Sequence, residues 1–270
     1  MTNIDIRHGD CLEVLRDLPD NSVNSVVTSP PYAMQRKSTY GGIQEKDYPE
    51  WTVAWMREVW RVLKDDGSVI INISSHVKNG ELSDYVLRTR LALREDGWAE
   101  LDEMIWNKPN AMPTGSPGRP RRSWESLLWY GKNGKVWSDA KANGSPTKWR
   151  TNVQSASSHQ KGWAHSAVGG LSTPSRARCA NVATFVTNEH VPDAFKHPAK
   201  YPVALAEWCG KLITPPGGTI LDPFTGSSST GVAAIKNGWN FIGIDQSAEY
   251  VEMSRKRLDE ELAKAAEKLK

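Results

Sequence analysis

Residues 68–73 form an almost continuous apolar run, with Val69, Ile70, Ile71 and Ile73 on both alternating faces. A strand that is apolar on both faces is typical of a parallel sheet covered by helices on each side. Segments of strand and helix length alternate around this run with short connections, which predicts right-handed βαβ units. We therefore expect an α/β, doubly wound, mostly parallel sheet. Its strands would cover residues 4–8, 25–28, 68–73, 103–107, 126–130 and 241–245, and its helices residues 11–18, 48–63, 82–93, 203–212, 232–237 and 258–270.

A rigid turn, Ser29-Pro30-Pro31-Tyr32, follows the strand expected at residues 25–28. Two successive prolines fix φ and remove two backbone donors, so the carbonyls of Ser29 and Pro30 need donors from elsewhere. The turn offers a hydroxyl, a free acceptor and a flat ring at the carboxyl end of a strand, where α/β sheets bind ligands. These groups suit a planar ligand with an amino group, and a plain proline-rich turn is the alternative.

A second turn, rich in small residues, runs from Asp222 to Ser228 after a strand that begins at Thr219. Its small residues let the backbone approach a ligand closely, and the N–H groups of the following helix face that ligand. Asp245 ends the next strand about twenty residues later, the position of a carboxylate that binds ribose hydroxyls in doubly wound folds. The glycine spacing of a dinucleotide fingerprint and the lysine of a P-loop are both missing.

The two turns resemble motifs of the DNA methyltransferases that modify exocyclic amino groups. Ser29 to Tyr32 resembles the catalytic motif, in the serine form of the N4-cytosine branch, and the Asp222 turn resembles the S-adenosylmethionine motif. Gly9-Asp10 resembles the adenine-side motif, and the block around Lys200 and Pro202 resembles the motif at the methionine end of the cofactor. The order, with the catalytic turn first, is similar to the permuted β group of this family.

This resemblance implies a circularly permuted, seven-stranded methyltransferase sheet with an inserted target-recognition region. It implies a catalytic half over residues 1–131, a target-recognition insertion over residues 132–191 and a cofactor-binding half over residues 192–270. The implied catalytic residues are Ser29, Pro30, Pro31 and Tyr32. The implied S-adenosylmethionine-binding residues are Asp10, Cys11, Lys200, Pro202, Asp222, Pro223, Phe224, Gly226, Ser227, Ser228 and Asp245.

The implied reaction is methyl transfer to N4 of a cytosine that has been flipped out of the duplex, with no metal. The alternatives are N6-adenine methylation, a methyltransferase of RNA or of a protein amide, and an inactive nucleic-acid-binding relative. A serine can hydrogen-bond to either base, so the preference for cytosine rests on the resemblance. An inactive relative should have lost Asp222, Tyr32 or the proline pair, and all of them remain.

Basic residues dominate residues 108–178, where only Glu125 and Asp139 are acidic, although the net charge of the chain is only +3. Tryptophans such as Trp124 and Trp149 lie among them, a combination that favours nucleic-acid binding over a merely solvated basic face. Arginines are bidentate phosphate donors, so we expect the loop between the strands at 103–107 and 126–130 to clamp the DNA backbone. The expected DNA contacts are Lys108, Arg119, Arg121, Arg122, Lys148 and Arg150.

The three cysteines are odd in number, lack metal-ligand spacing and never follow a proline. They are expected to be reduced thiols, and the Pro-Cys nucleophile of cytosine C5 methylation is missing. No apolar run approaches membrane-spanning length and no signal-peptide pattern is seen, which predicts a cytoplasmic protein. Double-stranded DNA is the expected partner, and a cognate restriction endonuclease and a homodimer are further expectations.

Overall fold

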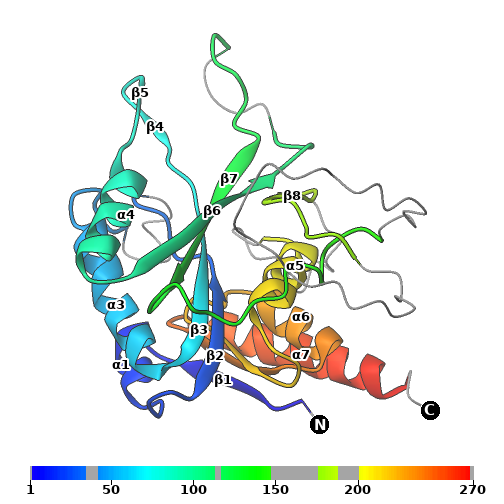
Figure 1. Cartoon of the computed structure of the whole chain (residues 1–270). Coiled ribbons are helices and arrows are strands. Elements are labelled where there is room, and N and C mark those ends of the chain that lie inside the picture. Colours follow the sequence, from blue (N-terminus) through cyan, green and yellow to red (C-terminus); the bar gives the residue numbers. More distant parts are fainter. Residues whose placement is uncertain (1, 35–41, 113–116, 147–175, 188–200, 268–270) are drawn as a thin grey trace, which may run out of the picture.

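The computed structural model of the 270-residue chain describes residues 2–34, 42–112, 117–146, 176–187 and 201–267 (Figure 1). The strands of its main sheet are β1 (Ile4–His8), β2 (Val23–Thr28), β3 (Leu63–Ile73), β6 (Ala99–Asn107), β7 (Trp124–Gly131), β8 (Val182–Thr184), β9 (Thr219–Asp222) and β10 (Asn240–Asp245). The helices are α1 (Cys11–Arg16), α3 (Tyr48–Val62), α4 (Tyr85–Glu95), α5 (Val203–Ile213), α6 (Ser229–Asn237) and α7 (Ala248–Glu267). A separate hairpin consists of β4 (Val77–Lys78) and β5 (Glu81–Leu82).

The main sheet has the strand order β1-β10-β9-β2-β3-β7-β6-β8. β7 is antiparallel to β3 and β6, and the remaining neighbouring pairs are parallel. Helices α1, α3 and α4 cover one face and α5, α6 and α7 cover the other (Figure 1). The expectation of a doubly wound, mostly parallel α/β sheet is confirmed.

Each face of the sheet has its own apolar core. Trp55 and Val59 of α3 pack on one face with Ile71 of β3, and all three are at most 2% exposed. Leu205 and Leu212 of α5 belong to the core of the opposite face. Burial on both faces explains why β3 is apolar along nearly its whole length.

Strand β2 joins the N-terminal and C-terminal parts of the chain. It pairs with β3 on one side and with β9 on the other, where Ser25 lies opposite Ile220 and Val26 opposite Leu221. Because β2 and β9 are parallel, their carboxyl ends lie side by side at the same edge of the sheet. The turn from Ser29 to Tyr32 and the turn after β9, which are far apart in the sequence, are therefore neighbours in the fold.

The structure differs from expectation in several elements. An eighth strand, β8, lies within the expected insertion and pairs with β6, with Val182 opposite Ile105. β3 begins at Leu63 rather than at residue 68, and its pairing with β2 shifts register between Val23 and Ser25. The helix expected at 82–93 begins at Tyr85, because residues 81–82 pair within the β4–β5 hairpin. The last helix is longer than expected and begins at Ala248.

Within the described residues, no helix is long and apolar enough to span a membrane.

Candidate active site

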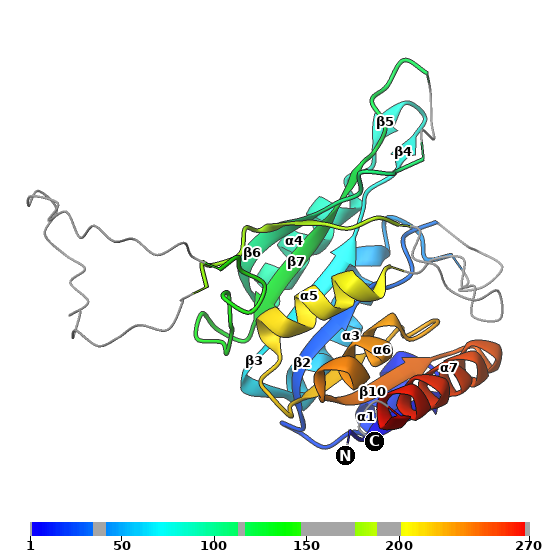
Figure 2. The ribbon, with the colours of Figure 1, turned by 90° about the vertical axis from the view of Figure 1, so that its right-hand side faces the viewer.

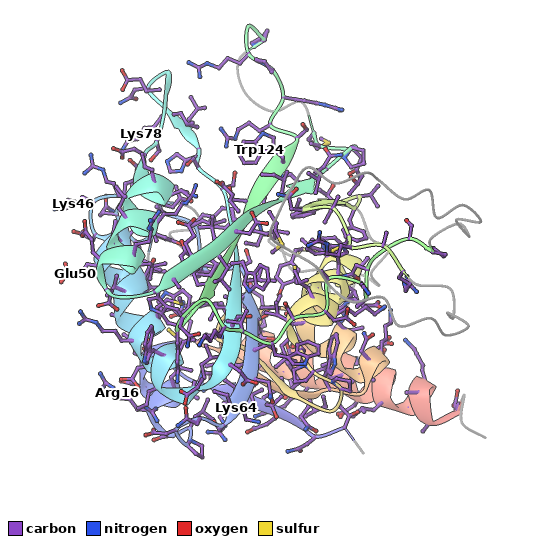
Figure 3. The ribbon with its side chains drawn as sticks, viewed as in Figure 1. Arg16, Lys46, Glu50, Lys64, Lys78 and Trp124 are labelled. Atoms are coloured by element: carbon purple, nitrogen blue, oxygen red, sulfur yellow. The ribbon has the colours of Figure 1, made fainter. Side chains whose placement is uncertain are left out.

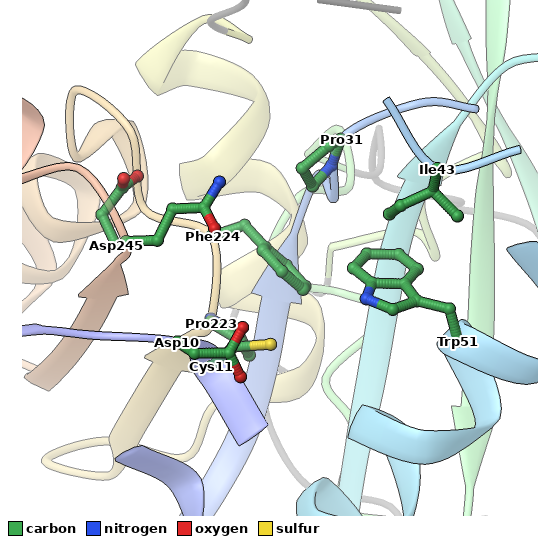
Figure 4. A pocket seen from close by; sticks show the side chains of 9 residues that line it. Asp10, Cys11, Pro31, Ile43, Trp51, Pro223, Phe224 and Asp245 are labelled. Carbon is green, nitrogen blue, oxygen red and sulfur yellow. The ribbon is translucent and has the colours of Figure 1, made fainter. Parts of the chain in front are cut away.

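A pocket of about 180 Å³ opens at the carboxyl ends of β1, β2, β9 and β10 (Figure 4). It is lined by Asp10, Cys11, Pro31, Ile43, Trp51, Pro223, Phe224, Asp245 and Gln246. Pro31 comes from the catalytic turn, whereas Pro223 and Phe224 come from the second turn, so the two predicted motifs share this pocket. Ile43, Trp51 and Gln246 were not predicted to belong to the site; of these three, only Gln246 has a signal in the sequence, because it directly follows Asp245.

One wall of the pocket carries fixed carboxylates. Asp245 ends β10, and its carboxylate accepts hydrogen bonds from the backbone N–H groups of Gly226 and Ser247, each at 2.9 Å. Burial raises the pKa of Asp245, and these two hydrogen bonds act in the opposite direction. Asp10 caps α1 by accepting a hydrogen bond from the N–H of Leu12 at 2.9 Å.

Aromatic side chains form the opposite wall. The ring centroids of Phe224 and Trp51 lie 5.5 Å apart, and Trp55 meets Phe224 edge-on at 5.3 Å. Cys11 is buried beside them, and burial raises the pKa of its thiol to about 12. The pocket thus combines flat apolar surface with acceptor groups, the chemistry that a purine nucleoside requires.

Asp222 lies behind this pocket rather than on its surface. Its carboxylate is 1% exposed and accepts hydrogen bonds from the hydroxyls of Thr28 at 2.7 Å and Thr230 at 2.8 Å. The Tyr201 hydroxyl at 3.0 Å and the Phe224 N–H at 3.1 Å also donate to it. Burial raises the pKa of Asp222, and the four hydrogen bonds oppose this rise. Asp222 therefore joins β2, β9, α6 and the segment before α5.

The turn after β9 is held from behind by α7. Gly226 has φ +51° and Ser228, which precedes α6, has φ +57°, so two residues of this turn adopt left-handed backbone. The Gly226 carbonyl accepts a hydrogen bond from the Ser254 hydroxyl, and the Ser227 carbonyl accepts one from Arg257, each at 2.6 Å. Ser254 and Arg257 precede residue 258, where the last helix was expected to begin, so these contacts were not predicted.

The turn from Ser29 to Tyr32, predicted to be catalytic, projects from the end of β2 beside the pocket. Pro30 is buried, whereas Ser29, Pro31 and Tyr32 are partly exposed. The Tyr32 hydroxyl donates a hydrogen bond of 2.8 Å to Oε2 of Glu125 on β7. Burial, with a smaller contribution from the charge of Glu125, raises the pKa of Tyr32 well above its usual value, so this phenol remains a donor.

Glu125 also binds Lys108 and Asn72. The Lys108 ammonium lies 2.6 Å from Oε1, and the Asn72 amide donates to Oε2 at 2.9 Å. The side chains of Lys108 and Glu125 are only 13% and 14% exposed. Lys108, expected at a DNA phosphate, is thus engaged by a carboxylate, and nothing in the local sequence indicated this pairing.

The expected DNA-binding arginines lie on the loop that leads from β6 to β7. Arg119 donates to the carbonyl of Gly80, Arg121 to that of Pro109 at 3.1 Å, and Arg122 to the Ser74 hydroxyl at 3.4 Å. This loop and the β4–β5 hairpin project together from one end of the sheet (Figure 2). Lys78 of the hairpin and Trp124 at the start of β7 also lie at this end (Figure 3).

Three expected site residues lie outside the described residues: Lys148, Arg150 and Lys200. Pro202 is described, and it is buried immediately before α5. Its carbonyl accepts hydrogen bonds from the N–H groups of Leu205 and Ala206.

A family model described as DNA methylase matches residues 23–256 of the chain. The type II methyltransferase M.XycI of Xanthomonas campestris pv. cyanopsidis is 32% identical, over 93% of this chain and 86% of that protein. M.PvuII of Proteus hauseri is 27% identical, over 91% of this chain and 81% of its own length.

Solved structures of similar fold include a PvuII DNA methyltransferase described as cytosine-N4-specific. It has a TM-score of 0.74 at 22% identity and covers 98% of this chain and 93% of its own. A modification methylase of Thermus thermophilus, TTHA0409, solved in complex with S-adenosyl-L-methionine, has a TM-score of 0.64 at 20% identity, over 97% of this chain and 95% of its own. At these identities, the structural similarity establishes the fold.

Proposed function

The chain belongs to the DNA methylase family, and we propose that it transfers the methyl group of S-adenosylmethionine to the N4 amino group of a cytosine in double-stranded DNA. The observation that supports this proposal most strongly is that residues of both turns line one pocket. Pro31 of the catalytic turn and Phe224 of the cofactor turn line the same cavity, so a methyl donor bound there would lie beside Ser29 and Tyr32.

The pocket residues fit this cofactor. The Asp245 carboxylate is held in place by Gly226 and Ser247 and can accept hydrogen bonds from ribose hydroxyls. The rings of Phe224 and Trp51 offer the flat surface that an adenine needs. Asp10 and Cys11 would bind at the adenine side, and the predicted Lys200 and Pro202 would serve the methionine end. Gly226, Ser227 and Ser228 are buried and do not line the pocket, so they would support it from behind.

The cofactor, when bound, supplies an activated methyl group on a sulfonium, so the chain's own contribution is positioning. The amino nitrogen of cytosine is a weak nucleophile because its lone pair is delocalised into the ring. The Ser29 hydroxyl and the Pro30 carbonyl accept hydrogen bonds from that amino group and orient the lone pair toward the methyl. Tyr32 stacks on the base, which must leave the duplex because its amino group cannot be approached in line while stacked.

The preference for cytosine over adenine rests on the resemblance of Ser29-Pro30-Pro31-Tyr32 to the serine form of the N4-cytosine branch. The PvuII methyltransferase, whose fold this chain shares, is described as cytosine-N4-specific, which supports the same choice. The alternative product is N6-methyladenine.

The DNA backbone would lie across the end of the sheet that carries Arg119, Arg121 and Arg122. Residues 132–191 would contain the target-recognition region, with Lys148 and Arg150 as further phosphate contacts. A cognate restriction endonuclease, a homodimer and a cytoplasmic location remain predictions, as does the division of the chain at residues 131 and 191.

Tritium transfer from labelled S-adenosylmethionine tests the proposal. Wild-type protein should label duplex DNA and leave RNA and protein unlabelled, and Ser29→Ala and Tyr32→Ala should lower labelling at least about tenfold. Both variants should bind the cofactor with near wild-type affinity in calorimetry, because neither side chain lines the pocket. Label that enters only RNA or protein would refute the proposed substrate.

A further inference from the structure

Glu125 is the second residue of β7, and its carboxylate binds three polar side chains from three different segments. Oε2 accepts hydrogen bonds from Tyr32 at 2.8 Å and from Asn72 at 2.9 Å, while Oε1 lies 2.6 Å from the Lys108 ammonium. The two oxygens therefore bind different groups. Oε2 faces the Ser29–Tyr32 turn and β3, and Oε1 faces the Lys108 ammonium.

The position of this carboxylate is fixed from several sides. Lys108 also lies over the ring of Trp106, 5.3 Å from its centroid, and is only 13% exposed. A largely buried ion pair is weakly screened by solvent, and removal of one partner leaves an uncompensated charge. Lys108 and Asn72 thus hold Glu125 in one orientation, and Glu125 in turn holds the phenol of Tyr32.

We propose that Glu125 is the positioning residue for the target base: through its hydrogen bond to the Tyr32 hydroxyl it sets the plane of the ring on which the flipped base stacks. This inference rests on the proposed function and assigns Lys108 to the active site as the counter-ion of Glu125. The ring of Tyr32 is then fixed at both ends, by the Pro30-Pro31 backbone and by Glu125. A small error in this plane misaligns the amino nitrogen with the incoming methyl, which slows the reaction without weakening cofactor binding.

Glu125→Gln tests this role, because the amide keeps the shape but has only one acceptor oxygen. In one orientation of the amide, its oxygen faces Tyr32 and Asn72, and its NH₂ then faces the Lys108 ammonium, which has no acceptor for it. In the other orientation, its oxygen faces Lys108 and the hydrogen bond from Tyr32 is lost. We expect the single-turnover methylation rate on unmodified plasmid DNA to fall about tenfold to a hundredfold. Cofactor affinity measured by calorimetry should stay within about twofold.

Two further variants separate positioning from a general loss of structure. Lys108→Met combined with Glu125→Gln removes the facing cation, so the amide oxygen can again accept from Tyr32, and the rate should recover at least about threefold over Glu125→Gln. Glu103→Gln is the matched control, since Glu103 is a strand carboxylate that pairs with Arg90 at 2.6 Å and accepts from Ser126 at 2.8 Å. Its rate should remain within about twofold of wild type.

A double-mutant cycle with Tyr32→Phe decides whether Glu125 acts through Tyr32. The Tyr32→Phe variant lacks the hydroxyl, so Glu125→Gln should slow this variant much less than it slows the wild type. An equal loss in both backgrounds, or a wild-type rate in Glu125→Gln, would overturn the inference alone. A wild-type protein that labels no DNA would overturn the proposed function and the inference with it.

Discussion

The hydroxyl of Thr28 donates a hydrogen bond of 2.7 Å to the carboxylate of Asp222, although 194 positions separate the two residues in the chain. Thr28 is the last residue of β2 and directly precedes Ser29, while Asp222 is the last residue of β9 and directly precedes the pocket residues Pro223 and Phe224. One buried hydrogen bond therefore joins the ends of the two paired strands that lead into the Ser29–Tyr32 turn and into the turn after β9.

Thr28→Val should destabilise the protein by about 1.5–3 kcal/mol, because it removes a hydrogen bond to a buried carboxylate while nearly keeping the side-chain shape. Urea denaturation of the two proteins measures this difference. Thr89→Val is a suitable control, since Thr89 is equally buried but donates to the neutral carbonyl of Tyr85 within α4. Its loss should be about 1 kcal/mol, and equal losses in the two variants would contradict a special role for the Thr28 bond.

Asp222→Ala should weaken cofactor binding by about tenfold or more, although Asp222 does not line the pocket. The N–H of Phe224 loses its acceptor, so the aromatic wall beside the cofactor loses its support. Asp222→Asn should be milder, because the neighbouring hydroxyls of Tyr201 and Thr230 can rotate to accept from the amide. Calorimetry that finds undiminished cofactor affinity in Asp222→Ala would refute this assignment.

Arg121→Ala combined with Arg122→Ala should reduce the salt dependence of DNA binding, with the slope of log K against log salt falling by about 1–2. Both residues lie on the projecting loop between β6 and β7. Lys108→Met should leave the slope unchanged, because its ammonium is paired with Glu125. An unchanged slope in the arginine variant, or a reduced slope in Lys108→Met, would reverse these assignments.

Iodoacetamide at pH 8 should label Cys179 before Cys11 and Cys209. The thiolate is the reactive form, and burial raises the pKa of Cys11 to about 12, so this thiol is protonated at pH 8 and ionises only near that pKa. Burial raises the pKa of Cys209 as well. The pKa of Cys179 is also raised by burial, but this thiol is partly exposed and the reagent can reach it. Mass spectrometry of tryptic peptides after partial labelling gives the order. Rapid modification of Cys11 would show that the pocket is more open than described.

The sequence predicted those parts of the fold that local patterns determine. The apolar run of β3, the Pro30-Pro31 turn and the small residues before α6 each carry a local signal, and their placement at one edge follows from parallel pairing. The β4–β5 hairpin was missed because its strands have two residues each and show no periodicity. The start of α4 was misplaced for the same reason.

The interactions that complete the site depend on tertiary structure. Glu125 lies on β7 and Lys108 follows the end of β6, 17 positions away in the chain, and the sequence suggested only that Lys108 belongs to a basic segment. Trp51 lies on the helix expected at residues 48–63, but its contact with Phe224 in the aromatic wall of the pocket joins two segments that are far apart in the sequence. Asp222 belongs to a motif that resembles one of the family, but two of its hydrogen-bond donors, Thr28 and Tyr201, come from segments that only the folded sheet brings next to it.

In the proposed reaction, a cofactor bound in this pocket delivers a methyl group to N4 of cytosine. The most direct measurement is mass spectrometry of nucleosides from plasmid DNA incubated with the purified protein and S-adenosylmethionine. We expect N4-methylcytosine in the wild-type reaction and at least about tenfold less in the Ser29→Ala reaction. N6-methyladenine as the sole product, or unmodified DNA with active cofactor binding, would contradict it.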